Sequence, residues 1–293
     1  MTAPTLTGTD AVRNGIGAIA GLRQAVLAEG PETESFLQGQ LSQDVASMAP
    51  HESRWSLLLH PQGKISAWLR VTRLDGERFL LDVDAGWADE VVTRLTRFKL
   101  RTKCELSISP WTSLTIVGHG ALQVEVEGGE LELHDSWAGL PVVIVFGPEP
   151  QADVPAIDLA TATALRIEAG RPAMGAELDD STIPAAAGIV DQSVSFTKGC
   201  YTGQELVARI DSRGNNVPRR LVGLVFDGDA AVTDDVEMTA DGQAVGVVTT
   251  AGRSGALDAD VALAYATRAV EVGDVVQAGG TTATVRELPL VTG

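Results

Sequence analysis

Cysteine and histidine are scarce in this sequence. Its 293 residues include two cysteines, Cys104 and Cys200, and four histidines. No Cys-x-x-Cys pair occurs, and the histidines lack the spacing of metal ligands. The sequence therefore predicts no metal site and no redox pair built from neighbouring residues. A free cysteine suits a reducing compartment, so we expect a cytoplasmic protein.

Basic residues and long apolar runs are also in short supply. Lysine and arginine number 22 against 39 aspartates and glutamates, which gives a formal net charge of −17. Broad nucleic-acid or anionic-membrane binding needs a basic face, and this balance argues against both. No run of about 18 apolar residues occurs, so we expect no membrane-spanning helix. Residues 1–30 lack a basic segment followed by an apolar core, so we also expect no secretion signal.

The chain does have enough apolar residues for two or three packed units. Hydrophobic residues make up 44% of the sequence, and the mean hydropathy is +0.11. Apolar periodicity predicts helices over residues 32–41, 88–100 and 159–169, the last with Asp158 as its N-cap. The segment 65–73 predicts a strand in which Ile65, Ala67, Leu69 and Val71 alternate with Ser66, Trp68, Arg70 and Thr72.

Short strands dominate the rest of the pattern. Before a proline-rich break at residues 147–155, further strands are predicted over residues 54–59, 78–83, 104–108, 111–117, 122–126 and 141–146. After residue 219 they are predicted over residues 221–226, 244–250, 261–265, 275–276 and 282–286. Residues 1–30 predict only an extended lead-in with one strand, and we expect residues 10–21 and the tail after Leu288 to be poorly determined. The order of elements favours an α+β chain that ends in a small β-barrel or sandwich.

One octapeptide stands out chemically. Residues 198–205 have the sequence Lys-Gly-Cys-Tyr-Thr-Gly-Gln-Glu, and a helical pattern begins at its end. The glycines permit a sharp turn and close backbone approach to a ligand. A helix start and a lysine both favour a thiolate at Cys200, and they also suit an anion. The alternative is a glycine turn that buries a small cysteine in the core.

This octapeptide resembles the signature of the YgfZ family, folate-binding relatives of the glycine-cleavage T protein, an aminomethyltransferase. Residues 36–45, 62–65, 166–170, 183–188 and 191–196 resemble further segments of that family. The resemblance implies a T-protein-like, three-part architecture with a central channel. Two interleaved α+β subdomains would occupy residues 1–217, the first of them discontinuous, with boundaries near 50 and 110–155. A β-barrel domain would occupy residues 218–293. It also implies binding of tetrahydrofolate or a related reduced folate.

Five residues around the signature are candidates for function. Cys200 is the candidate working thiol, and Lys198 is its candidate partner or a contact of the folate tail. Tyr201 would stack on a planar ring, or simply pack. Gln204 would contact the ligand, or cap the helix that it begins. Arg209 would bring positive charge near the ligand.

The ring of the folate needs a different partner. Glu168 is the candidate, because a buried carboxylate can accept two N–H bonds from the aminopyrimidine edge of a pterin. The alternative is an ion pair between Glu168 and Arg166 or Arg171. Arg171 is otherwise a second candidate for charge near the ligand.

A basic cluster follows the helix predicted over residues 88–100. It contains Arg94, Arg97, Lys99, Arg101 and Lys103. One interpretation is favourable placement of positive charge at a helix C-terminus. The other is a basic rim for an anionic tail, such as the glutamates of folate.

One departure from the T protein bears on activity. T-protein relatives that move a one-carbon unit carry paired aspartates just after their hairpin glycines, and the matching place here is Ser66-Ala67. Without a carboxylate there, no base is evident for deprotonating the folate nitrogen. The resemblance thus implies a folate-binding accessory protein that supports assembly or repair of iron–sulfur enzymes, with those enzymes or cluster-assembly proteins as partners. A tetrahydrofolate-dependent one-carbon transferase or demethylase, and a plain interaction module with a vestigial pocket, are the alternatives.

Overall fold

The computed structural model describes residues 5–212, 214, 216–228, 230 and 232–292. Its contacts divide the chain into two compact units. The signature unit contains Leu22–Trp111 and Ala173–Val217, and the barrel unit contains Met1–Gly21, Thr112–Pro172 and Pro218–Gly293. Each unit is therefore assembled from segments that are distant in the sequence. No helix in the described part of the chain is long and apolar enough to cross a membrane.

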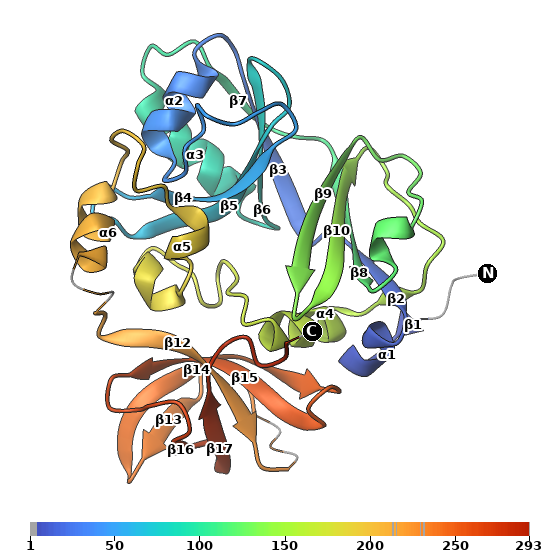
Figure 1. Ribbon diagram of the computed structural model, residues 1–293, viewed down its shortest axis with the longest axis vertical. Coiled ribbons are helices and arrows are strands. Elements are labelled where there is room, and N and C mark those ends of the chain that lie inside the picture. The colour runs from blue at the N-terminus through green and yellow to red at the C-terminus, as the bar shows by residue number, and fades with distance from the viewer. Residues whose placement is uncertain (1–4, 213, 215, 229, 231, 293) are drawn as a thin grey trace. The chain divides into compact units, whose positions relative to one another are not determined.

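The signature unit is built on a five-stranded antiparallel sheet in the order β4-β5-β6-β3-β7 (Figure 1). Its strands are β3 (Arg23–Glu29), β4 (Ser53–Leu59), β5 (Ile65–Arg73), β6 (Arg78–Asp84) and β7 (Glu105–Ile108). Its helices are α2 (Thr33–Gln40), α3 (Ala88–Lys99), the short α5 (Val190–Ser193), α6 (Gln204–Asp211) and the 3-10 helix η2 (Pro184–Ala187). The predicted helices over residues 32–41 and 88–100 are thus confirmed.

Strand β5 lies inside this unit with both faces covered. The predicted alternation of side chains is present, but the residues of both sets are buried, Ser66 and Arg70 included. Helix α3 contacts the strand, and the indole nitrogen of Trp68 donates to the hydroxyl of Ser193 in α5 at 2.9 Å. A central strand of this kind has no solvent face for its polar residues, which must find partners inside the protein.

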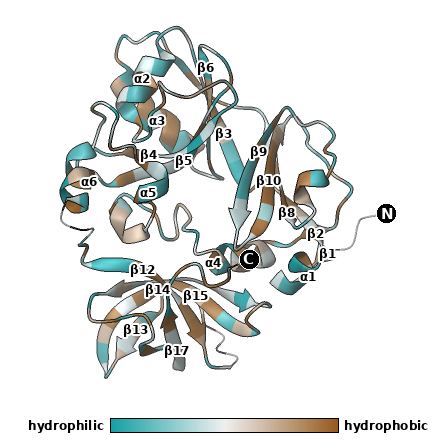
Figure 2. Cartoon of the chain, in the orientation of Figure 1, coloured by the Kyte–Doolittle hydropathy of each residue, from teal (hydrophilic) through white to brown (hydrophobic). Residues whose placement is uncertain are grey.

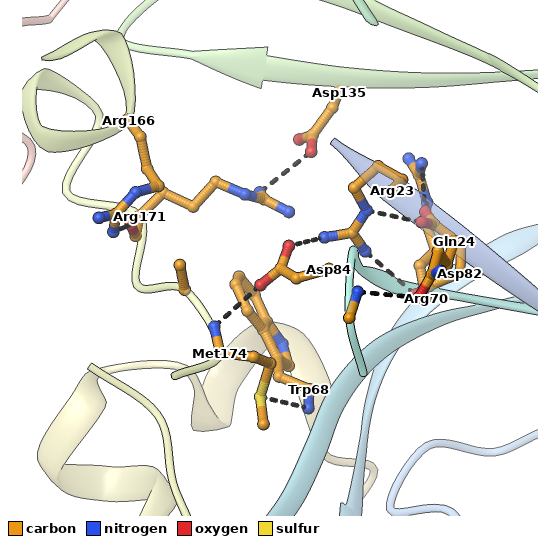
Figure 3. Close-up of polar contacts among 12 residues, drawn as sticks. Arg23, Gln24, Trp68, Arg70, Asp82, Asp84, Asp135, Arg166, Arg171 and Met174 are labelled. Atoms are coloured by element: carbon orange, nitrogen blue, oxygen red, sulfur yellow. Dashed lines mark hydrogen bonds and ion pairs between the residues drawn. The ribbon is translucent and has the colours of Figure 1, made fainter. Parts of the chain in front are cut away.

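A buried ion network supplies such partners (Figure 3). The carboxylate of Asp82 is fully buried and accepts from Arg23 Nε at 2.6 Å and from Arg70 Nη2 at 2.8 Å. Asp84, which pairs with Arg23 across the sheet, accepts from the same guanidinium group. Both guanidinium groups lie over the ring of Trp55, at 5.5 and 5.3 Å from its centroid. Removing one partner would leave a buried charge uncompensated.

The barrel unit contains a sheet and a barrel. The sheet has six strands in the order β1-β11-β2-β8-β10-β9. Its strands are β1 (Thr5–Leu6), β2 (Ile16–Ala20), β8 (Thr112–Gly118), β9 (Leu131–Trp137), β10 (Leu140–Gly147) and β11 (Ala156–Ile157). The unit also holds α1 (Thr9–Arg13) and α4 (Leu159–Glu168). Asp158 caps α4 as predicted, because its carboxylate accepts from the backbone N–H of Thr161 at 2.7 Å.

The C-terminal strands close into a barrel in the order β12-β15-β14-β13-β16-β17 (Figure 1). They are β12 (Arg219–Phe226), β13 (Glu237–Ala240), β14 (Gln243–Ser254), β15 (Ala259–Thr267), β16 (Val275–Ala278) and β17 (Thr281–Arg286). Hydrophobic and hydrophilic residues both occur along these strands (Figure 2), as expected for a sheet with one face inside and one outside. The predicted β-rich C-terminal region is confirmed as a barrel.

Two local predictions are wrong, and one long strand was missed. Residues 122–126 do not form a strand: the 3-10 helix η1 (Ala121–Gln123) lies there, and Leu122 is 51% exposed, so this short apolar run does not enter a sheet. Strand β9 was not predicted, although Leu131 and Leu133 alternate with polar neighbours. Residues 10–21 are well defined, because β2 pairs with β8 and that partner lies about a hundred residues along the chain.

Candidate functional site

The signature loop of the signature unit is anchored on the segment that follows α2. The ammonium group of Lys198 donates to the backbone carbonyls of Gln38 at 2.6 Å, Leu41 at 2.6 Å and Gln43 at 3.0 Å. The backbone N–H of Thr202 donates to the carbonyl of Gly39 at 3.1 Å. The loop is therefore held at both ends by one short stretch of backbone.

Lys198 is engaged fully by this arrangement. An ammonium group has three donors, and three carbonyls accept from it. Burial lowers the pKa of Lys198 to about 8, and the nearby charge of Asp44 opposes that shift. Its nitrogen also lies 5.2 Å from the ring centroid of Tyr201. Lys198 thus anchors the loop, and in the described residues no contact joins it to Cys200, its predicted partner.

Two glycines let the loop pack closely on the β4–β5 turn. Gly203 has φ of +84°, and a Cβ there would lie 2.6 Å from the carbonyl oxygen of His60. Gly63 has φ of +76°, and a Cβ there would lie 2.5 Å from the Cβ of Leu206 in α6. Only glycine meets both the left-handed backbone and this close approach. The glycines thus fix the start of α6 against the turn.

The loop presents one thiol outward. Cys200 is exposed, and within the described part of the chain its sulfur has no hydrogen-bond partner. Tyr201 is half-buried against the apolar core of the signature unit, and burial raises the pKa of its hydroxyl to about 12. Gln204 begins α6, and its side-chain oxygen accepts from the backbone N–H of Tyr201 at 3.2 Å. The loop therefore carries an exposed, free thiol at Cys200.

The second cysteine differs in every respect. Cys104 is 2% exposed and packs in the core of the signature unit. Burial raises the pKa of its thiol. It is therefore a packed core thiol rather than a reactive one.

Arg209 lies farther along α6. Its side chain is exposed, and it has no ion-pair partner among the residues described. Together with Lys198, Cys200, Tyr201 and Gln204 it belongs to one continuous loop and helix. Five of the seven predicted site residues are therefore neighbours in the signature unit.

A carboxylate does reach the Ser66 position. The hydroxyl of Ser66 donates to Glu90 Oε1 at 2.9 Å, and Glu90 comes from the first turns of α3. The other oxygen of Glu90 accepts no hydrogen bond in the part of the chain that is described. The sequence contains no carboxylate at Ser66-Ala67, but the fold brings one there from 24 residues away.

Glu168, the predicted pterin contact, is occupied by the protein itself. It is fully buried in the barrel unit, where Oε1 accepts from the hydroxyls of Thr9 and Ser254, each at 2.6 Å. Oε2 accepts from Arg13 Nη2 at 2.6 Å and Nε at 3.2 Å. The geometry favours the ion-pair alternative, but the partner is Arg13 and neither Arg166 nor Arg171. The pterin contact of Glu168 stays a prediction.

Arg171 also lies in the barrel unit and has a carboxylate partner. Its Nη1 is 3.0 Å from Asp135 Oδ2, and its backbone carbonyl accepts from Arg166 Nη1 at 2.8 Å. Figure 3 shows this pairing of Arg171 with Asp135. The predicted contact of Arg171 with a ligand stays a prediction.

Sequence reasoning missed the partners of Lys198 and of Glu168. The carbonyls that hold Lys198 are more than 150 residues away, and backbone groups carry no side-chain signal. Arg13 and Thr9 lie in the N-terminal stretch that showed no pattern. Among the described residues, no group of three or more histidine, cysteine or carboxylate side chains is arranged to hold a metal ion.

The fold and part of the sequence match known proteins. Residues 219–291 match the family described as the glycine cleavage T-protein C-terminal barrel domain. The structure resembles the glycine cleavage system aminomethyltransferase T from Bartonella henselae with a TM-score of 0.77 over 94% of this chain and 86% of that one. Sequence identity is 21%, so this likeness concerns the fold. The predicted T-protein-like fold is confirmed.

Relatives in sequence point to one branch of that fold. The tRNA-modifying protein YgfZ of Pectobacterium carotovorum is 29% identical over 216 residues, and that of Escherichia coli O127:H6 is 28% identical over 214. The chain is similar in sequence to the YgfZ proteins. The matches span 64% of this chain and 63% and 65% of those YgfZ proteins. A protein of Haemophilus influenzae described as uncharacterized is 26% identical over 218 residues, which is 76% of its length.

This similarity agrees with the resemblance that the octapeptide carries. The residues that carry it have a defined geometry: an anchored loop, one outward thiol and a half-buried tyrosine.

Proposed function

We propose that this protein binds a reduced folate and acts through the thiol of Cys200. Its role would be to support the assembly or repair of iron–sulfur enzymes, including enzymes that modify tRNA. The observation that carries the proposal is the anchored signature loop, which presents an exposed thiol without a partner in the described structure. The relatives described as tRNA-modifying proteins support the class of process.

The physical case for a working thiol rests on contrast. A cysteine that only packs is buried, as Cys104 is, whereas Cys200 is exposed on a loop fixed by three charge-assisted hydrogen bonds. A rigid loop presents its thiol in one orientation, which lowers the entropy lost on reaching a partner. An exposed free thiol persists in a reducing compartment, so we place this activity in the cytoplasm.

The folate half of the proposal rests on the fold, on the similarity to YgfZ proteins and on the acceptor groups of Glu90 and Glu168. The aminopyrimidine edge of a pterin offers N–H donors and needs a carboxylate acceptor. Both oxygens of Glu168 already accept from protein donors, whereas Glu90 has an oxygen without a partner in the described residues. Glu90 therefore fits this requirement better than Glu168. A reduced folate, when bound, supplies one-carbon units or reducing equivalents.

A second function has one specific observation in its favour. The pairing of Glu90 with Ser66 places a carboxylate where the sequence alone showed none. A carboxylate in hydrogen-bond contact with a hydroxyl can accept a proton, as a one-carbon transferase requires. A tetrahydrofolate-dependent transferase or demethylase is therefore the alternative activity, with Glu90 as its base.

Titration of the full chain with tetrahydrofolate tests the shared part of both functions. We expect saturable binding, unchanged in Cys200→Ser because the loop is shaped by its lysine and glycines. Aminomethyl transfer in a reconstituted glycine-cleavage assay separates the two activities: the accessory function predicts none, and turnover lost in Glu90→Gln would establish the transferase. No binding at millimolar tetrahydrofolate would contradict both.

A further inference from the structure

Two adjoining clefts lie beside the turn between α3 and β7 in the signature unit. The first has a volume of about 460 Å³, and its lining includes Lys99, Lys103 and Thr102. The second has a volume of about 380 Å³, and its lining includes Arg101, Phe36 and the same Thr102. Each volume falls in the range of small-ligand sites, roughly 300–1,000 Å³. The turn thus divides a basic surface into two hollows.

The cations of this turn have no anionic partners. In the described part of the chain, Arg97, Lys99, Arg101 and Lys103 take part in no ion pair, although the sequence has 39 acidic residues. The carboxylate of Glu32 contacts the backbone of this turn instead, because it accepts from the backbone N–H of Lys103 at 2.5 Å. Interaction with the helix dipole would explain positive charge in the last turn of α3. It does not explain the charges of Arg101 and Lys103, which lie beyond the end of the helix.

Leu100 shows that the turn is held in a costly conformation. It has φ of 49° and ψ of −112°, a backbone conformation that residues other than glycine rarely adopt. Its side chain is 89% exposed, so burial of apolar surface does not offset that cost. Strain of this kind concentrates at ligand-binding turns. Here it directs Lys99 and Arg101, its two neighbours, to different clefts.

The lining also indicates which anion fits. Glu29 and Glu105 line the first cleft and Glu32 lines the second. These carboxylates would repel a strand of closely spaced phosphates, but they can accept from N–H groups. Burial raises the pKa of Cys104, so the thiol in the first cleft adds no negative charge. The clefts therefore suit a chain that alternates carboxylates with amide N–H groups.

We propose that these clefts bind the oligo-γ-glutamyl tail of a folate, with Lys99, Arg101 and Lys103 contacting its carboxylates. Each γ-glutamyl residue carries one carboxylate and one amide N–H, which matches the mixed lining. The inference rests on the proposed folate binding and assigns a place to the tail of that ligand. Three exposed ion pairs of this kind should together strengthen binding about tenfold, or about 1.4 kcal/mol.

The test is calorimetric titration of the full chain with tetrahydrofolate monoglutamate and pentaglutamate. We expect the wild-type chain to bind the pentaglutamate about tenfold more tightly. The triple variant Lys99→Gln, Arg101→Gln, Lys103→Gln should bind both forms with the monoglutamate affinity of the wild type. A control triple, Arg78→Gln, Arg253→Gln, Arg286→Gln, removes the same charge from exposed positions elsewhere and should keep the preference.

The other outcomes separate this inference from the proposed function. Equal affinity of the wild type for both forms would overturn the tail site and leave folate binding intact. No binding of either form would overturn both. Equal loss in the control triple would show a general charge effect and overturn the site. A titration with a short RNA gives the last outcome. If the wild type binds the RNA, the cleft variant does not, and the variant keeps its preference for the pentaglutamate, the clefts bind phosphate and the proposal is overturned.

Discussion

Replacing Glu168 with glutamine distinguishes a structural carboxylate from a ligand-binding one. In the structure this side chain is fully buried and accepts four hydrogen bonds from Thr9, Arg13 and Ser254. Glutamine keeps the shape but removes the charge and replaces one acceptor oxygen with a donor. The Arg13 guanidinium is then left without its ion-pair partner in the interior.

The magnitude follows from those contacts. Breaking a buried ion pair by removing one partner costs about 3–5 kcal/mol. Arg13 keeps 17% of its side chain exposed, so water relieves part of its charge and the lower end applies. We therefore expect Glu168→Gln to lower the free energy of unfolding by about 3 kcal/mol. The variant Arg13→Met should cost a similar amount, and the double variant should cost less than the sum, because both remove one interaction.

Urea unfolding of the full chain, followed by fluorescence, measures these changes, and tetrahydrofolate titration of each variant measures the ligand. A control, Glu132→Gln, removes an exposed carboxylate and should change stability by less than about 1 kcal/mol. We expect folate affinity to be unchanged in Glu168→Gln at temperatures where it is folded. A loss of affinity with unchanged stability would refute the structural role and restore Glu168 as the pterin contact.

Three further predictions concern the signature unit. Because burial places the pKa of Lys198 at about 8, below the ordinary value of 10.5, the unfolded chain binds more protons between those pH values. The free energy of unfolding should therefore rise across that window in the wild type relative to Lys198→Met, and equal pH profiles would contradict this. Asp82→Asn leaves Arg23 and Arg70 buried and should cost about 3–5 kcal/mol in urea unfolding, whereas Asp75→Asn, which removes a carboxylate with 43% of its side chain exposed, should cost less. Gly203→Ala should cost about 1–3 kcal/mol and change the alkylation rate of Cys200, whereas Gly76→Ala, with open space around it, should change neither.

The sequence predicted the features that depend on interactions between residues close together in the chain. Asp158 is an N-cap because its own side chain reaches a backbone N–H three residues on, and β5 forms where apolar residues alternate. The paths of β2 and β9 depend on partners that local patterns do not contain. Strand β5 carries Arg70 in the middle of a sheet and is still buried, because Asp82 on the neighbouring strand accepts from the Arg70 guanidinium.

The candidate site was predicted in its residues but not in its contacts. The octapeptide predicted Cys200 and Lys198 as site residues. The three groups that accept from Lys198 are backbone carbonyls, which every residue type has, so the sequence could not indicate them. Arg13 and Glu168 are 155 residues apart, and an isolated acidic residue gives no indication of which arginine it meets. Likewise the absence of a carboxylate at Ser66-Ala67 was correct for the sequence, but Glu90 supplies one through the fold.

The most direct test of the account is complementation of a bacterium that lacks its own YgfZ, scored by the activity of an iron–sulfur-dependent tRNA-modifying enzyme. Wild type and Cys104→Ser should restore that activity, since Cys104 is a packed core thiol. Cys200→Ser should not restore it, although the purified variant should keep the wild-type stability and folate affinity. Full rescue by Cys200→Ser at matched protein levels would contradict the claim that the outward thiol of the signature loop is the working group.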